Sequence, residues 1–314
     1  MLARVANNLY WMGRYIERAE HTARFLKVNY FSSLDAPNKL SQSRQFVLQS
    51  IYQMVGETMF INDTLEEETV LFNVGLNSEK TYSILNSVKN ARENANSSRD
   101  LISTEFYESI NKFYHHVMNY PSDVLVKSGL YDFTSTITEH TAILRGKIRG
   151  TLLHDEIYAL IMLGINIERA TQIIRIIKTK FDDAHKAIGG YANPVKNSYE
   201  WTTLLKCAES YDMMRRLYKK SPTQLSTLEF LILNPSCPRS VMNSLNQIYT
   251  NICTIDNAKI FDKDSPAFLI GKMRAEYEFK TIEEIQINVQ NFIEKTSQLL
   301  FSIGFKLENE YFYV

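Results

Sequence analysis

The hydrophobic positions near the start of the chain follow the period of an α-helix. Apolar residues recur there in alternating steps of four and three, at Val5, Leu9, Met12, Ile16, Ala19, Ala23, Leu26 and Tyr30. This spacing places all of them on one side of a helix. The pattern therefore predicts a helix over residues 3–31 with one side buried in a core.

A second stretch repeats both the apolar pattern and part of the sequence. Its apolar positions predict a helix over residues 155–180. Residues 13–19 and 164–170 both read Gly-x-x-Ile-Glu-Arg-Ala, and an Arg and a Lys follow each at the same offsets. These seven matches fall in one ungapped register. We interpret them as an internal duplication.

Each predicted helix also carries a polar row, about a quarter-turn around from its apolar row. The row comprises Gly13, Glu17, Glu20 and Arg24 in the first helix and Gly164, Glu168, Thr171 and Arg175 in the second. A glycine inside a helix costs about 1 kcal/mol against alanine. Two glycines at equivalent positions therefore indicate close packing or the approach of a ligand. We favour packing, because the repeat preserves its apolar row better than its polar row.

The remainder of the chain is also typical of helices. Only 11 glycines and 7 prolines occur in 314 residues, which favours long helices over a turn-rich β fold. We therefore predict an all-α fold, a multi-helix bundle in one domain over residues 1–314, with an internal pseudo-twofold repeat. Its halves would cover residues of about 1–120 and 121–314. Two further helices are expected over residues 122–153 and 201–218.

Composition and charge narrow the classes of function. Lys plus Arg and Asp plus Glu number 35 each, so the net charge is zero and gives no overall attraction to nucleic acid or to an anionic membrane. The three cysteines have no C-x-x-C spacing, which argues against a disulfide framework or a cysteine zinc site. The first residues form no apolar signal segment, and the longest apolar run, about residues 157–167, is too short to cross a bilayer. These features predict a soluble, cytoplasmic protein that binds neither nucleic acid nor membrane.

Four segments together resemble the alpha-E family of bacterial proteins. They are the opening Ala-Asn-Asn-Leu-Tyr-Trp-Met-Gly-Arg-Tyr-Ile-Glu-Arg-Ala-Glu, the block Ala-Arg-Glu-Asn…Arg-Asp-x-Ile-Ser-Thr-Glu, the second Glu-Arg-Ala helix, and Phe-Leu-Ile-Leu-Asn-Pro…Pro-Arg-Ser-Val at residues 230–241. The resemblance covers nearly the whole chain and implies an all-helical fold. It also implies an operon shared with a circularly permuted ATP-grasp ligase, and often with transglutaminase-like and proteasome-like hydrolases. This arrangement indicates a system for peptide ligation or modification.

A candidate polar site follows from the repeat and from the segments that carry the resemblance. Its residues are Gly13, Glu17, Arg18, Glu20, Arg24, Arg92, Glu93, Asn94, Arg99, Glu105, Glu168, Arg169, Arg175 and Arg239. In one interpretation, the glutamates form a carboxylate site and the arginines bind an anionic group, since a guanidinium matches carboxylate and phosphate. In the other, the same side chains are partly buried salt bridges between helices.

The polar block at residues 91–106 also has two interpretations. Its side chains would either line a pocket facing the repeat helices or form a solvated surface with local pairs. Because the block lies between apolar helices, we predict that Arg92, Asn94 and Arg99 are buried and contact the glutamates of the repeat helices.

The basic cluster Arg145, Lys147 and Arg149 also has two interpretations. It is either a solvated surface or a docking patch for an acidic partner.

The sequence lacks the motifs that several kinds of metal and cofactor chemistry require. The chain has no Glu-x-x-His pair for a di-iron bundle, although Glu17 and His21 lie one turn apart, so we expect no metal. It has no nucleotide-binding loop and no nucleophile elbow, so we expect no cofactor.

Two hypotheses for function remain. In the first, the protein is an accessory or co-catalytic subunit that binds an ATP-grasp ligase, an anionic substrate, or both, with a homo-oligomer also possible. In the second, it is an enzyme in its own right that acts on a small amide or peptide through Glu17, Glu168 and the arginines. Buried glutamates with raised pKa values would favour the enzyme. Salt-paired glutamates and exposed apolar surface would favour the subunit.

Overall fold

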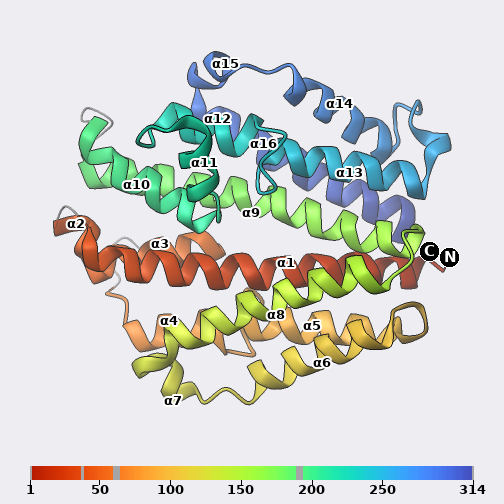
Figure 1. Ribbon diagram of the computed structural model, residues 1–314, viewed down its shortest axis with the longest axis horizontal. Helices are drawn as coiled ribbons and strands as arrows, with labels where there is room; N and C mark the ends of the chain where they lie inside the picture. The colour runs from red at the N-terminus through yellow and green to blue at the C-terminus, as the bar shows by residue number, and fades with distance from the viewer. Residues whose placement is uncertain (1, 37–38, 59–63, 189–193, 313–314) are drawn as a thin grey trace.

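The computed structural model describes residues 2–36, 39–58, 64–188 and 194–312. Figure 1 shows these parts as helices joined by short connections, and no β-strand occurs among them. The predicted all-α class is therefore confirmed.

The helices have the following bounds. The first group is α1 (Ala3–Ser32), α2 (Lys39–Gln42), α3 (Arg44–Val55), α4 (Glu67–Gly75), α5 (Ile84–Ser97) and α6 (Thr104–Met118). The second is α7 (Ser122–Val124), α8 (Leu130–Thr151), α9 (Glu156–Ile188), α10 (Pro194–Cys207) and α11 (Tyr211–Tyr218). The third is α12 (Gln224–Leu233), α13 (Val241–Ile255), α14 (Pro266–Glu278), α15 (Ile282–Gln286) and α16 (Val289–Leu307).

The two repeat helices, α1 and α9, lie side by side at the centre of the molecule (Figure 1). They run in the same direction, and residues at equivalent positions of the repeat lie opposite each other along both helices. The predicted contact between the repeat helices is thus confirmed. Both helices carry long apolar rows, and a helix of this kind is stable only when other elements cover its apolar side. This requirement explains why the two helices lie at the centre of the molecule.

Different helices cover the outer sides of this central pair. Helices α5 and α8 pack on α1, while α13 and α16 pack on α9 (Figure 1). The C-terminal residues return to the first helix, where the ring of Phe312 lies 4.9 Å from that of Tyr10. The duplication of whole halves stays a prediction, because the reciprocal contacts described here are confined to α1 and α9.

Gly13 and Gly164 allow the two backbones to approach closely. A methyl group added at Gly13 would collide with the carbonyl of Ile161, and one added at Gly164 would collide with the carbonyl of Tyr10. Both obstacles are backbone atoms of the opposite helix, which cannot move aside as a side chain would. The glycines are therefore packing positions, as the sequence favoured.

The helix predicted over residues 122–153 is interrupted near its start. A short π-helical turn, Leu125–Gly129, separates α7 from α8. A π turn has hydrogen bonds between residues five apart in sequence, so two such residues lie closer to the same side of the helix than they would in an α-helix. It therefore allows Leu125 and Leu130 both to face the core, where both are buried.

The prediction of one continuous helix over residues 201–218 is wrong, because the helix is interrupted between α10 and α11. At the break, Glu209 adopts a φ of 54°, in the left-handed region that non-glycine residues rarely occupy. A helix cannot pass through this conformation. The break also places the Glu209 carboxylate beside Arg24, at 2.9 Å. The expected linker at residues 189–194 lies almost wholly outside the described residues.

A buried charged network joins α1, α3, α9 and α10. The Lys180 ammonium donates to Asn29 at 2.6 Å and to Asp183 at 2.8 Å, and lies 3.7 Å from Glu200. Ser50 donates to the same Asp183 carboxylate at 2.6 Å. The lysine and both carboxylates are almost fully buried, and each of these charged groups has a partner of opposite charge inside the protein.

Helix α9 is apolar because it forms the core. Among the described residues, the segment Glu156–Lys186 is the one helix that is long and apolar enough to cross a membrane, and 83% of its most apolar window is buried inside the molecule. Its hydrophobic surface is thus already covered by other helices of the same chain.

Candidate functional site

The two Glu-Arg pairs of the repeat exchange partners across the α1–α9 contact. The Arg169 guanidinium of α9 donates to both carboxylate oxygens of Glu17, at 2.6 and 3.0 Å. The Arg18 guanidinium of α1 donates to both oxygens of Glu168, at 2.7 and 3.1 Å. Each motif therefore supplies the glutamate for one paired, bidentate interaction and the arginine for the other.

Each glutamate is also bound from its own helix, one turn further on. The Nε2 atom of His21 lies 3.1 Å from a Glu17 oxygen, and the Gln172 amide donates to Glu168 at 2.7 Å. His21 and Gln172 occupy equivalent positions of the repeat. The reciprocal arrangement of the two motifs thus includes the residues that support the glutamates.

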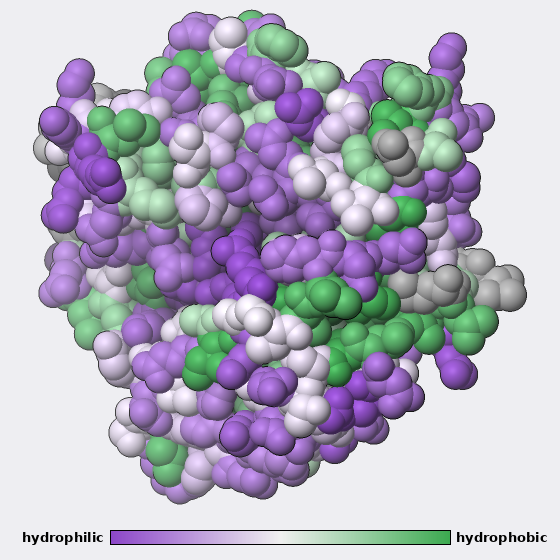
Figure 2. Space-filling view, turned by 45° about the vertical axis from the view of Figure 1, so that its right-hand side comes forward, coloured by the Kyte–Doolittle hydropathy of each residue, from purple (hydrophilic) through white to green (hydrophobic). Residues whose placement is uncertain are grey.

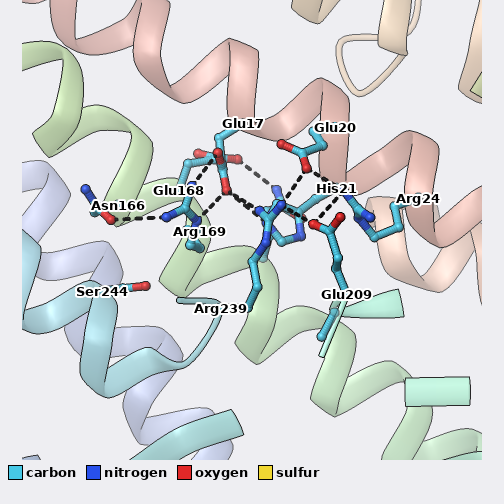
Figure 3. Close-up of polar contacts among 12 residues, drawn as sticks. Glu17, Glu20, His21, Arg24, Asn166, Glu168, Arg169, Glu209, Arg239 and Ser244 are labelled. Atoms are coloured by element: carbon cyan, nitrogen blue, oxygen red, sulfur yellow. Dashed lines mark hydrogen bonds and ion pairs between the residues drawn. The ribbon is translucent and has the colours of Figure 1, made fainter. Parts of the chain in front are cut away.

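The first glutamate belongs to a larger network, shown in Figure 3. Arg239, from the turn between α12 and α13, donates to Glu17 at 3.1 Å and to Glu20 at 2.6 Å. It also donates to Glu209, from the break between α10 and α11. Arg239 therefore ties three separate segments of the chain to α1.

Two more arginines complete this network. Arg24 donates to Glu20 at 2.5 Å and contacts Glu209, and Arg145 of α8 donates to the other Glu20 oxygen. The network then contains four guanidinium groups, those of Arg24, Arg145, Arg169 and Arg239. It contains three carboxylates, those of Glu17, Glu20 and Glu209, so one positive charge remains in surplus.

The second glutamate has a smaller network. Besides Arg18, Arg14 donates to Glu168 at 2.9 Å and lies 3.8 Å from Glu308 near the C-terminus. Thr171 takes the place that Glu20 has in the first helix. The second network therefore lacks the carboxylate that draws further arginines into the first.

The electrostatic environment keeps both motif glutamates ionised. Burial by itself would raise the pKa of Glu17, but Arg169, His21 and Arg239 outweigh it and hold that pKa well below its usual range. The pKa of Glu168 is lowered in the same way, because Arg18 and Arg14 outweigh the effect of burial. The pKa of His21 is lowered by burial, which favours the neutral imidazole. Neither glutamate has the raised pKa that a general acid requires at neutral pH.

An arginine-lined cavity opens beside the first network. It has a volume of about 340 Å³ and is lined by Ala142, Arg145, Gly146, Arg149, Arg169, Pro238 and Arg239. None of the residues that line it is acidic. Figure 2 shows that the middle of this side of the molecule is strongly hydrophilic and hollowed. We call this cavity the arginine pocket.

Positive charge accumulates at the arginine pocket. Burial lowers the pKa of Arg145 to about 10, and repulsion from Arg239 and Arg169 acts in the same direction against the attraction of Glu17. Arg149 is exposed and makes no ion pair within the described parts of the chain. The pocket therefore presents guanidinium groups whose charge the protein compensates only in part.

The structure brings together half of the predicted site residues and separates the rest. In contact through the two networks are Glu17, Arg18, Glu20, Arg24, Glu168, Arg169 and Arg239. Gly13 serves helix packing, and Arg175 lines a different cavity, between α3, α9 and α16. The salt-bridge interpretation thus describes the glutamates, while the arginines around the pocket retain capacity for an anion.

The predicted contacts between the polar block at residues 91–106 and the glutamates of the repeat helices are wrong. Arg92 donates to Asn111 at 3.1 Å, and Arg99 donates to Thr104 at 3.2 Å, so both pair within the α5–α6 region. Glu105 and Glu93 are exposed. The reason is that α5 packs on the opposite side of α1 from the motif glutamates.

That opposite side of α1 is aromatic. Glu93 and Asn94 line a shallow cavity of about 240 Å³ together with Trp11 and Tyr15. The aromatic rings of α1, rather than its carboxylates, therefore face the polar block. Within the block, Ala91 and Ala95 are buried in the core, while Arg92, Asn94 and Arg99 are half-buried.

Several network residues were not among the predicted site residues. Arg14 and Glu209 had no signal beyond their own charge, because their network partners are at least 30 residues away in sequence. Gln172 had the same spacing signal as His21, four residues from a motif glutamate on its own helix. Arg145 was noted only as part of a basic cluster, and it is the one member of that cluster that joins the network. His21 had a usable signal, its spacing of four residues from Glu17 on one helix.

Within the ranges that the structure describes, no group of three or more His, Cys, Asp or Glu side chains is arranged to hold a metal ion.

Comparison with known proteins identifies one family. The match covers residues 1–312 and is to Alpha-E, described as a predicted alpha-helical domain with a conserved ER motif. Neither the curated proteins nor the solved structures contain a match. The chain is helical throughout its described parts and carries Glu-Arg pairs at residues 17–18 and 168–169. It therefore belongs to the Alpha-E family.

Proposed function

We propose that the protein is an accessory subunit of an ATP-grasp peptide-ligase-type system, and that its arginine pocket holds an anionic group of the substrate. The observation that carries the proposal is the lining of the pocket, which contains four arginines and no acidic residue. A carboxylate or phosphate group in the pocket would compensate the surplus positive charge of the first network.

The network behind the pocket is suited to hold its arginines in fixed positions. Arg169 and Arg239 are buried, and each uses two guanidinium nitrogens to bind carboxylates of α1. A binding site needs such support, because a guanidinium with a fixed orientation loses less entropy when a ligand binds. In this proposal the glutamates position the arginines, and the arginines bind the ligand.

The state of the glutamates favours a subunit over an independent enzyme. Glu17 and Glu168 are buried, are paired with arginines, and have lowered pKa values. A carboxylate of this kind is a poor proton donor at neutral pH and a weak base. The chain also has no nucleotide-binding loop, so the ATP-dependent step would belong to the partner.

The choice of partner rests on the resemblance of the sequence to a family whose operons contain a circularly permuted ATP-grasp ligase. Exposed apolar side chains on the surface support an interaction with another protein. Phe301 and Phe305 lie one turn apart on α16 and are 76% and 57% exposed. Large apolar residues grouped on a surface are more typical of interaction surfaces than of free ones.

A reconstituted assay tests the proposal. The ATP-grasp ligase that the resemblance leads us to expect in the same operon would be incubated with its substrate and ATP, and ADP release would be measured with and without this chain. We expect the chain to increase substrate-dependent ADP release. We expect Arg149→Gln to reduce that increase, because Arg149 lines the pocket but makes no ion pair that the fold requires.

Lys147→Gln is the matched control. It removes one positive charge from the same helix at a residue that does not line the pocket. Equal loss in both variants would point to a general charge effect and contradict a role for the pocket. The absence of any effect of this chain on ADP release would contradict the accessory function itself.

A further inference from the structure

A second cavity lies on the other side of α9, between α3, α9 and α16. Its volume is about 720 Å³, within the range of small-molecule sites. The residues that line it are Gln53, Thr171, Ile174, Arg175, Lys178, Thr179, Asp182, Ile293, Glu294, Ser297 and Gln298. We call it the α9–α16 cavity. It shares no lining residue with the arginine pocket.

The internal repeat shows why this cavity is open and charged. Arg175 and Lys178 occupy the positions of Arg24 and Lys27 in α1. In α1 both cations have partners: Arg24 contacts two glutamates, and Lys27 donates to Ser135 at 2.8 Å. In α9 neither cation has an ion pair with any described residue.

The absence of these pairs has a local cause. Thr171 stands where α1 has Glu20, and its hydroxyl is already bonded to the Ile167 carbonyl at 2.8 Å. The carboxylate that neutralises Arg24 therefore has no counterpart beside Arg175. Although the Arg175 side chain is exposed, partial desolvation by the surrounding atoms lowers its pKa, and repulsion from Arg18 and Arg14 adds to this effect against the attraction of Glu168. An anionic ligand would relieve that repulsion.

The α9–α16 cavity differs from the arginine pocket in the sign of its charges. Two cations, Arg175 and Lys178, are balanced by two carboxylates, Asp182 and Glu294. A ligand with only negative charge would be attracted by one pair and repelled by the other. A ligand that carries one charge of each sign would gain from both.

The two carboxylates are not equivalent. Asp182 accepts a hydrogen bond from the Gln53 amide at 2.6 Å, so part of its capacity is used. Glu294, on the facing helix α16, is exposed and has no ion pair among the described residues. Glu294 is therefore the carboxylate that is available to a positive group.

The remaining lining fits the backbone of a short peptide. Ser297 and Gln298 of α16 make no side-chain hydrogen bond within the described residues, which leaves donors and acceptors for amide groups. Ile174 and Ile293 give the walls an apolar component. Sites of this kind combine apolar walls with a few polar groups that fix the orientation of the ligand.

We propose that the α9–α16 cavity binds a short peptide with free ends, its carboxylate at Arg175 and Lys178 and its ammonium at Glu294. The proposal stands independently of the arginine pocket, because the two cavities have different linings and select different charge patterns.

Calorimetric titration with three related ligands tests the proposal. Trialanine carries both charges, N-acetyl-trialanine carries only the negative one, and trialanine amide carries only the positive one. We expect trialanine to bind the full chain with a dissociation constant on the order of 1 mM. We expect each blocked ligand to bind about tenfold more weakly, since each loses one charge-assisted interaction.

Two variants assign the ends of the peptide to the two walls. Arg175→Gln should remove the preference for trialanine over its amide, and Glu294→Gln should remove the preference over the acetylated form. Arg216→Gln, at an exposed arginine of α11 that does not line the cavity, is the control and should bind as the wild type does. Both cavity variants change exposed side chains without ion pairs, so the fold should be kept.

Three results would overturn the proposal. One is an absence of heat from trialanine at concentrations about tenfold above the expected dissociation constant. Another is equal binding of trialanine and N-acetyl-trialanine, which would indicate a site for anions alone. The last is unchanged binding in both Arg175→Gln and Glu294→Gln.

Discussion

Gly13 and Gly164 set the distance between the two central helices, because each faces the backbone of the other helix. We predict that Gly13→Ala and Gly164→Ala each lower the free energy of unfolding by more than about 1–3 kcal/mol, since the obstacle is backbone, while the gain in helix propensity is only about 1 kcal/mol. Thermal or urea unfolding measures the difference.

Gly146 is the matched control for these substitutions. It lies inside α8, and a methyl group added there meets no atom within 4 Å. Gly146→Ala should therefore stabilise the protein by up to about 1 kcal/mol through helix propensity alone. Destabilisation by Gly146→Ala, or its absence in the two central variants, would contradict the packing explanation.

His21 gives the first network a dependence on pH. Burial lowers the pKa of His21 below its ordinary value of 6.5. The unfolded chain therefore binds a proton before the folded chain does, so stability is full above about pH 6.5 and falls as the pH decreases toward the folded pKa. His21→Gln, which copies the residue at the equivalent position in α9, should remove this part of the pH dependence.

Urea unfolding at a series of pH values between about 5 and 8 measures the effect. The wild type should lose stability toward the acid end, and the variant should change less. If the free energy of unfolding changed with pH in the same way in both proteins, the pKa of His21 would not differ between the folded and the unfolded chain, which would contradict this prediction.

At the scale of the elements, the sequence predicted what lies along one helix better than what lies between helices. The apolar rows of α1 and α9 and the close approach of their glycines followed from period and repetition. The partners of Arg92 and Arg99 did not, because nothing in the sequence states on which side of α1 the helix α5 packs. The break at Glu209 was also hidden, since the helical pattern continues through it.

Part of the candidate site was likewise predictable. The Glu-Arg pairs were visible as a repeat, but their exchange between helices depends on α1 and α9 running in the same direction. Arg239 was found only through the resemblance of its segment to the family. Arg145 became part of the network because α8 crosses α1 at Glu20, which is a property of the fold and not of any local pattern.

The buried network around Lys180 provides a test at the element scale. Lys180→Met would leave Asp183 and Glu200 buried without their cation, and loss of one partner of a buried ion pair typically costs about 3–5 kcal/mol. Lys178→Met, two residues earlier on α9, changes an exposed lysine without an ion pair and should cost less than about 0.5 kcal/mol. Urea unfolding compares the two, and equal effects would contradict the structural role of Lys180.

For the whole molecule, the paired glutamates contribute to the loss of stability in acid. The pKa values of Glu17 and Glu168 are lowered in the folded protein, whereas the unfolded chain takes up protons near pH 4.3. The stability that they contribute is therefore present above that pH and is lost as the pH falls below it. We expect acid unfolding to begin in this range.

Glu168→Gln separates this contribution from others. At neutral pH the variant should be less stable than the wild type, because Arg14 and Arg18 lose their common carboxylate. The difference should shrink as the pH falls below about 4, where the wild-type glutamate itself becomes protonated on unfolding. A difference that stays constant down to the acid transition would contradict the depressed pKa.

The arginine pocket should bind an anionic group, and calorimetric titration with citrate tests this binding most directly. The wild type and Lys147→Gln should bind citrate with similar affinity, and Arg149→Gln should bind it about tenfold more weakly, because one charge-assisted contact is lost. Failure of the wild type to bind citrate, or equal binding by Arg149→Gln and the wild type, would contradict the claim.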